Sequence, residues 1–168
     1  TGFYYDFDFN GGDVPTEKNF KEIEKSMRTL LKSWEAFSHK EMSPEEAIKH
    51  FPGNEYKKEL IEEFAGEGKT LTLYTCGAFD DLCRGGHAEN PSKEIASDSF
   101  CLDKIAGAYW RGDEKKPMLT RIYGLAFDTK ESLDAYKVQR EEAKKRDHRK
   151  LGAELDLFLT SELVGAGL

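Results

Sequence analysis

The sequence has few cysteines and no long apolar run. Its 168 residues include only 3 Cys, an odd count without the spacing of a disulfide framework. This argues against a small disulfide-bonded secreted fold and favours a reducing compartment. No stretch has the apolar length of a membrane span, and residues 1–5 do not show the basic and apolar pattern of a signal peptide. We therefore expect a cytoplasmic protein without a membrane partner.

Internal repeats and low-complexity tracts are also absent, and the length fits one domain or one domain with a long appendage. The net charge of −7 argues weakly against a nucleic-acid partner. Residues 111–150 differ, because they hold 12 Lys and Arg against 8 Asp and Glu, which makes this segment +4 and the rest −11. Such a segment is either a basic face that contacts phosphates or a solvated helix with interspersed charges.

Helix signals are clear in the first part of the chain. Pro15 and Thr16 precede a helix whose apolar residues follow a 3.6-residue spacing, namely Phe20, Ile23, Met27, Leu30, Leu31 and Trp34. The string Ser43-Pro44-Glu45-Glu46 is a capping box that predicts a short helix ending before Pro52. A further helix is expected over about residues 55–64.

Strand patterns follow a different period. Residues 3–9 alternate, which places Phe3, Tyr5, Phe7 and Phe9 on one face of a strand. Four more segments are expected to form strands of one mixed or antiparallel sheet: 71–74, 79–82, 100–105 and 119–127. With the helices above, this indicates an α+β fold with a mainly antiparallel sheet.

Residues 130–158 contain no proline and only one glycine, so they predict one long helix. Its apolar residues are sparse, which predicts a helix that projects from the domain. Residues 159–168 end on the apolar string Val-Gly-Ala-Gly-Leu. We expect the chain to be part of a longer protein.

Residues 81–87, Asp-Leu-Cys-Arg-Gly-Gly-His, place a thiol and an imidazole four positions apart. Cys83 and His87 supply two ligands, whereas zinc needs four. Arg84 and His87 are suited to activating a nucleophilic Cys83, although nothing marks an oxyanion hole. The alternative without function is a buried cysteine and a histidine that is hydrogen-bonded in a turn. Two glycines let the backbone approach a ligand closely, which favours a polar pocket.

This motif resembles Asp-Leu/Met-Cys-Arg-Gly-Pro-His in the editing domain of the threonyl-tRNA synthetase family, which alanyl-tRNA synthetases share in looser form. Other strings agree in order and spacing: Gly-Phe-Tyr-Tyr-Asp at 2–6, Tyr-Lys at 56–57, Gly-Ala-Tyr-Trp-Arg-Gly-Asp at 107–113, Met-Leu-Thr-Arg-Ile-Tyr-Gly at 118–124, and Lys-Arg-Asp-His-Arg-Lys-Leu-Gly at 145–152. The resemblance covers essentially the whole chain.

The resemblance implies a domain order. Residues 1–128 are expected to be an editing domain that lacks its N-terminal part, 129–158 a linker helix, and 159–168 the start of a class II catalytic domain. The family's catalytic domain binds ATP, magnesium and zinc, and we expect no cofactor in this segment and no metal at Cys83 and His87. The parent enzyme is expected to be a homodimer through that catalytic domain, and this segment a monomer.

The resemblance also implies a function. The family ligates threonine to tRNA(Thr) with ATP and hydrolyses seryl-tRNA(Thr) made in error, because one methyl group discriminates too weakly in binding. Lys57, Asp81, Cys83 and His87 match the family's catalytic positions. Lys57 matches a lysine that positions water or the terminal ribose, Asp81 a carboxylate that orients the serine, and Cys83 and His87 the groups that line the pocket.

Substrate and tRNA contacts complete the expected site. Tyr5 matches a pocket tyrosine, and Arg84 either binds a tRNA phosphate or pairs with a carboxylate. The basic residues Lys144, Lys145, Arg149 and Lys150 are expected to contact the acceptor end of tRNA(Thr). The alternative is that these charges pair with neighbouring protein groups.

Two departures from the family pattern bear on activity. Gly86 stands where the family has proline, which loosens the turn before His87. The family's His-x-x-x-His motif is absent from these 168 residues. We therefore expect the chain alone to be inactive as a hydrolase. The alternative function is a module that binds the tRNA acceptor arm through a degenerate editing site.

Overall fold

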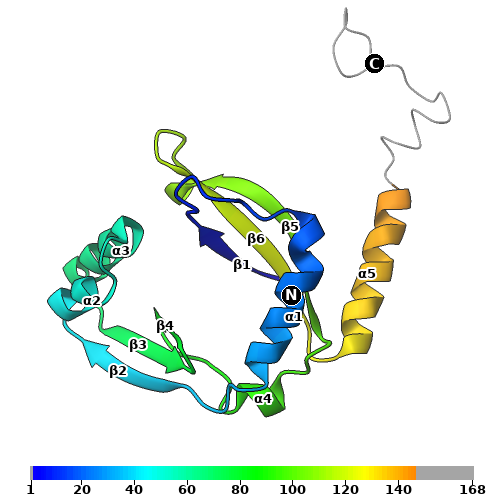
Figure 1. The fold of residues 1–168 in the computed structure, drawn as a ribbon, viewed down its shortest axis with the longest axis horizontal. Helices are drawn as coiled ribbons and strands as arrows, with labels where there is room; N and C mark the ends of the chain where they lie inside the picture. The colour runs from blue at the N-terminus through cyan, green and yellow to red at the C-terminus, as the bar shows by residue number, and fades with distance from the viewer. Residues whose placement is uncertain (1, 147–168) are drawn as a thin grey trace, which may run out of the picture. The chain divides into compact units, whose positions relative to one another are not determined.

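The computed structural model describes residues 2–146. They form two compact units. The terminal unit consists of the residues up to Val14 together with those from Asp98 onward, and the inserted unit is Pro15–Ser97. Each unit contains its own three-stranded antiparallel sheet (Figure 1).

The terminal unit consists of strands β1 (Gly2–Phe7), β5 (Phe100–Tyr109) and β6 (Met118–Ala126), the 3-10 turn η2 (Trp110–Gly112) and helix α5 (Lys130–Lys145). Strand β6 is central, and β1 and β5 pair with it on either side. The register joins distant parts of the chain, since Gly2 pairs with Leu125 and Phe7 with Thr120. The sheet therefore depends on contacts between the first strand and the last.

Helix α5 is attached to this sheet near its own first turns. Leu133 is buried with Cys101 and Leu125, and Phe127 packs against them. Two turns further along α5, Arg140 Nη1 donates to Asp103 Oδ1 at 2.5 Å. This bond raises the pKa of Arg140 above its ordinary value. The predicted helix is confirmed for Lys130–Lys145, and residues 147–158 of that prediction lie outside the described residues.

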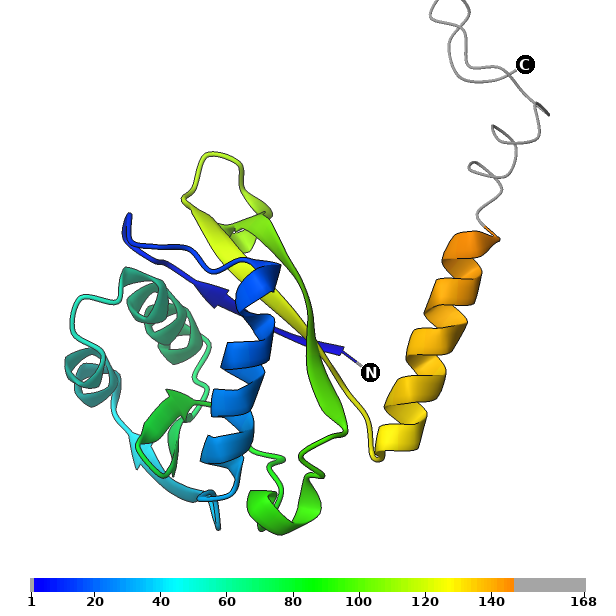
Figure 2. The same cartoon turned by 45° about the vertical axis from the view of Figure 1, so that its right-hand side comes forward.

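The inserted unit carries the remaining elements. They are the 3-10 turn η1 (Glu17–Asn19), helices α1 (Phe20–Leu31), α2 (Pro44–His50), α3 (Glu55–Gly66) and α4 (Pro91–Glu94), and strands β2 (Ser38–Met42), β3 (Leu71–Cys76) and β4 (Phe79–Leu82). Strand β3 is central between β2 and β4. Helices α2 and α3 lie side by side in both views (Figure 1 and Figure 2).

Capping residues fix where these helices begin. Ser43 Oγ accepts the Glu46 amide and Glu46 Oε2 accepts the Ser43 amide, which is the predicted capping box. Asn54 Oδ1 caps α3 by accepting the Lys57 amide at 2.9 Å. The apolar faces of the two helices then meet the sheet, because Ala47, Ile61 and Leu71 form one buried core.

The α+β fold class is confirmed, but the expectation of one sheet is wrong. The strands divide between two sheets, because β1 pairs with β6 and β3 with β2 and β4. Strand β2 was not predicted, and α1 ends at Leu31, before Trp34. Among residues 2–146, no helix has both the length and the apolar character needed to cross a bilayer.

Candidate functional site

The predicted motif lies at the end of β4 and in the loop that follows it. Asp81 is in the strand, opposite Tyr74 of β3, while Cys83 still donates its amide to Thr72 O at 3.0 Å. Beyond Cys83 the chain leaves the sheet through Gly85 and Gly86, whose φ angles are 95° and 81°. Both values lie in the left-handed region that glycine adopts without steric cost.

Lys57 and Asp81 form an ion pair, although they are 24 positions apart in the sequence. The ammonium of Lys57 comes from the first turn of α3 and also lies 4.5 Å from the centroid of the Phe51 ring. Asp81 Oδ1 additionally accepts the Leu82 amide at 2.7 Å. Both side chains are about four-fifths buried, at 21% and 23% exposure. The structure thus holds a lysine and a carboxylate together at the edge of the sheet.

His87 lies between two aromatic rings. The centroid of its ring is 4.2 Å from that of Phe37 and 4.5 Å from that of Tyr74. Its Nε2 is buried and has no hydrogen-bond partner among the described residues. An unpaired buried polar atom costs about 1–3 kcal/mol, which a hydrogen bond from a ligand or water recovers. The arrangement is therefore suited to a polar ligand.

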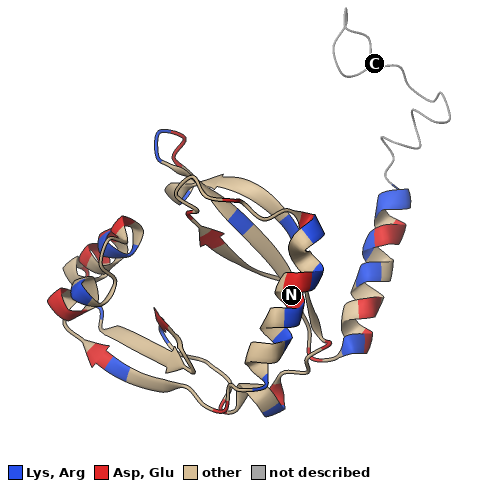
Figure 3. Ribbon diagram, viewed as in Figure 1, with Lys and Arg blue, Asp and Glu red and all other residues tan. Residues whose placement is uncertain are grey.

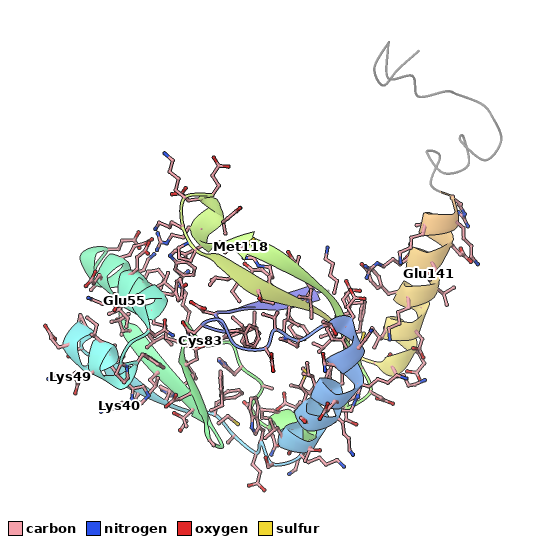
Figure 4. The ribbon with its side chains drawn as sticks, turned by 45° about the horizontal axis from the view of Figure 1, so that its top comes forward. Lys40, Lys49, Glu55, Cys83, Met118 and Glu141 are labelled. Carbon is pink, nitrogen blue, oxygen red and sulfur yellow. The ribbon has the colours of Figure 1, made fainter. Side chains whose placement is uncertain are left out.

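Cys83 is a free, exposed thiol, and Figure 4 labels it at the end of β4. Its Sγ is 3.9 Å from the carbonyl oxygen of Gly85, which is at most a weak contact. Cys76 and Cys101 are buried. Burial raises the pKa of the Cys76 thiol, so this group stays protonated and unreactive near neutral pH.

Arg84, next to Cys83, is exposed and lies 5.6 Å from the centroid of the Phe64 ring. The pKa of Glu67 is lowered, mainly by the hydrogen bond from Lys69, and the charge of Arg84 makes a smaller contribution in the same direction. Neither contact is an ion pair with a carboxylate, so both predicted roles of Arg84 stay open.

The other predicted residues that the structure describes lie in the terminal unit. Tyr5 is in β1, where its ring packs 5.1 Å from that of Phe7. In the last turn of α5, Lys144 Nζ donates to Glu141 Oε1 at 2.8 Å, and both side chains are exposed. Lys145 ends α5, whereas Arg149 and Lys150 lie outside the described residues.

A metal ion at the motif would need more ligands than these residues provide. Cys83 and His87 are two candidates where zinc takes four. In the part of the chain that the structure describes, no cluster of three or more His, Cys, Asp or Glu side chains is placed to hold a metal. The donor set of the described residues therefore does not fit zinc.

Three residues around the motif were not identified from the sequence. Tyr74 and Phe37 pack against His87, and His39 stacks on Tyr74 with ring centroids 5.4 Å apart. The only signal for Tyr74 is its alternation with Leu71 and Leu73, which are buried. Phe37 directly precedes β2 and His39 lies within it, and the polar sequence of this strand gave no strand signal.

The similarity to known proteins extends over essentially the whole chain. No family model matches it. It is 51% identical to the threonine–tRNA ligase of Citrifermentans bemidjiense over 100% of this chain and 26% of that protein. The threonine–tRNA ligase of Dehalococcoides mccartyi is also 51% identical, over 100% of this chain and 28% of that protein. That of Thermotoga petrophila is 48% identical over 99% of this chain and 25% of that protein.

The chain spans about a quarter of the length of the curated relatives it matches. The identity extends over both units and is not confined to the motif at residues 81–87. The resemblance predicted from the sequence strings is confirmed.

Proposed function

We propose that this chain, which matches a segment of threonyl-tRNA synthetases over its whole length, contributes to an editing site that hydrolyses seryl-tRNA(Thr). The complete enzyme would ligate threonine to tRNA(Thr) with ATP in the cytoplasm. The observation that carries the proposal is the ion pair of Lys57 and Asp81. The resemblance assigned them to one site through two separate strings, at 56–57 and 81–87. Their side chains, from α3 and β4, contact each other.

The need for editing follows from the substrates. Serine differs from threonine by one methyl group, and a pocket distinguishes such a difference by only about 10–200-fold. A second site that accepts the smaller amino acid and rejects the larger one improves this ratio. Its reaction is the attack of water on the ester that joins serine to the tRNA.

Each side chain has a role in this proposal. An ammonium donates up to three hydrogen bonds, and Asp81 takes one from Lys57, so the others are directed at a water molecule or the terminal ribose. Asp81 holds Lys57 and orients the amine or hydroxyl of serine. His87 and Cys83 line the pocket and contact the substrate or water. When water attacks, the carbonyl oxygen of the ester gains negative charge and needs a hydrogen-bond donor. The ammonium of Lys57 also supplies this donor.

Tyr5 and Arg84 are proposed as substrate contacts, and Lys144, Lys145, Arg149 and Lys150 as contacts to the acceptor end of the tRNA. The proposal includes a homodimeric parent enzyme. The chain alone is expected to lack hydrolase activity, because its water-activating set is incomplete without the family's His-x-x-x-His motif.

The test compares two adjacent lysines of α3 in the complete synthetase. Lys57→Gln should slow hydrolysis of seryl-tRNA(Thr) by about 100-fold, since removal of one donor at such a site has this size of effect. Lys58→Gln is the matched control, because Lys58 is exposed and lies 3.8 Å from Glu55. Threonine ligation should be unchanged in both variants.

Alanine at Cys83 and at His87 tests the rest of the set. Loss of hydrolysis with retained tRNA binding supports the editing role. Hydrolysis at the parent rate in all three site variants would contradict it, and would favour the alternative of an acceptor-arm binding module.

A further inference from the structure

Tyr74 lies in the central strand of the sheet of the inserted unit and is close to Asp81, Gly85 and His87 of the motif. In the register of this sheet it stands opposite Asp81 of β4 and opposite His39 of β2. Its ring stacks on His39 and lies 4.5 Å from the ring of His87. Among residues 2–146, only Tyr74 combines these two strand pairings with a ring contact to His87.

The ring of Tyr74 does not belong to the apolar core of its unit. Leu71 and Leu73, which lie on the other face of β3, are buried at 5% and 8% exposure. Tyr74 is only half-buried and points to the opposite face of β3, because successive side chains of a strand alternate. Burial in the core that holds Leu71 therefore does not explain a large aromatic residue here.

The loop before His87 fits closely against the same tyrosine. A Cβ atom added at Gly85 would lie 2.7 Å from the Tyr74 hydroxyl, closer than van der Waals contact permits. The backbone of Gly85 thus packs directly on Tyr74. Gly85 and Gly86 both have positive φ, and the chain that follows them places the His87 ring next to those of Tyr74 and Phe37.

We propose that Tyr74 is a positioning residue for His87. The rings of Tyr74 and Phe37 both pack on the imidazole, and this ring packing holds it in place. The imidazole is held so that its unpaired nitrogen keeps one orientation toward the ligand. The effect on hydrolysis rests on the proposed editing role of His87, whereas the orientation of the ring does not.

The first test measures the orientation directly, in the 168-residue chain. A proton next to two aromatic rings has a shifted NMR resonance, because ring currents alter the local field. In Tyr74→Leu the His87 ring signals should move toward those of a free histidine, and in Tyr74→Phe they should stay close to the parent values. Unchanged His87 signals in Tyr74→Leu would overturn the proposal.

The second test uses hydrolysis of seryl-tRNA(Thr) by the complete synthetase. Tyr74→Leu should lower kcat by about 10–100-fold with a smaller change in KM, because a displacement of about 1 Å has effects of this size. Tyr74→Phe, which keeps the ring, should leave kcat within about twofold of the parent value. Tyr136→Leu is the matched control, since Tyr136 packs on one ring, Phe127, in the terminal unit.

The two tests separate two kinds of failure. A shifted His87 signal with unchanged hydrolysis would retain the positioning role and remove His87 from the proposed function. A Tyr74→Phe variant as impaired as Tyr74→Leu would overturn the role of ring packing. If urea unfolding shows that Tyr74→Leu does not fold, Phe37→Leu removes the other ring contact and gives the same readouts.

Discussion

Gly86 is the residue at which this chain departs from the family motif, and its backbone gives the reason. Its φ is 81°, whereas proline is restricted to about −65°. The loop in this chain therefore follows a path that proline does not allow. The loop is built for glycine, and the departure is not simply a loosened version of the proline turn.

Substitution of Gly86 is predicted to destabilise the chain through its backbone. No atom lies within 4 Å of an added Cβ, so Gly86→Ala should cost only the strain of a left-handed residue, about 1–2 kcal/mol. Gly86→Pro should cost more, because φ itself must change. Urea unfolding measures both.

Gly66→Ala is the control for these variants. Gly66 also has open space around an added Cβ, but it ends helix α3 without a positive φ. Alanine there should stabilise by about 0.5–1 kcal/mol. Gly86→Pro with the parent's stability would show that the loop does not require a positive φ.

Among the elements, helix α2 offers a measurable pH dependence. Hydrogen bonding to the Ser43 amide, followed by the charge of Lys40, lowers the pKa of Glu46. A carboxylate whose pKa is lower in the folded state than in the unfolded state stabilises the folded protein at pH values above the unfolded-state pKa. This stabilisation is lost as pH falls through the folded pKa.

Glu46→Gln should therefore be less stable than the parent at neutral pH, and the difference should shrink as the solution is acidified below about pH 4. Ser43→Ala, which removes the other half of the box, should cost about 1 kcal/mol. Urea unfolding at a series of pH values checks both. A Glu46→Gln difference that is constant with pH would contradict the assigned role of the carboxylate.

Local patterns predicted elements better than they predicted pairing. The capping box located α2, alternation located β1, and β3 and β4 were also expected as strands, because these signals depend on residues close in sequence. Strand β2 has the polar sequence Ser-His-Lys-Glu-Met, and only its backbone pairing with β3 makes it a strand. The division into two sheets depends on pairs such as Gly2 with Leu125, which no local pattern encodes.

At the scale of the whole molecule, the candidate site is distributed over elements that the sequence separates. Lys57 and Asp81 were assigned through resemblance, since a lone lysine and a lone aspartate carry no signal of their own. Tyr74 and Phe37 were missed because their contacts with His87 arise only when β3 and the loop come together. Composition and spacing alone indicated a pocket but not its supporting residues.

The proposed tRNA contact at the basic end of α5 is a property of the whole molecule that can be tested on particular charges. Positive and negative residues alternate along this helix (Figure 3), and Lys144 and Arg146 pair with Glu141 and Glu142. Such exposed pairs contribute little stability, so a phosphate competes with them readily. The pairing seen in the structure is therefore compatible with tRNA contact.

The prediction concerns the salt dependence of tRNA(Thr) binding by the complete synthetase. Each phosphate contact on a duplex adds about 0.9 to the slope of log K against log salt. Replacing Lys144 and Lys145 by Gln should therefore reduce the magnitude of the slope by about 1.8 if both contact the acceptor stem. Gln at Lys18 and Lys25, exposed lysines of the inserted unit, is the control and should leave the slope unchanged. An equal slope for the two pairs would assign the charges of α5 to contacts within the protein, because released counterions are the source of the salt dependence.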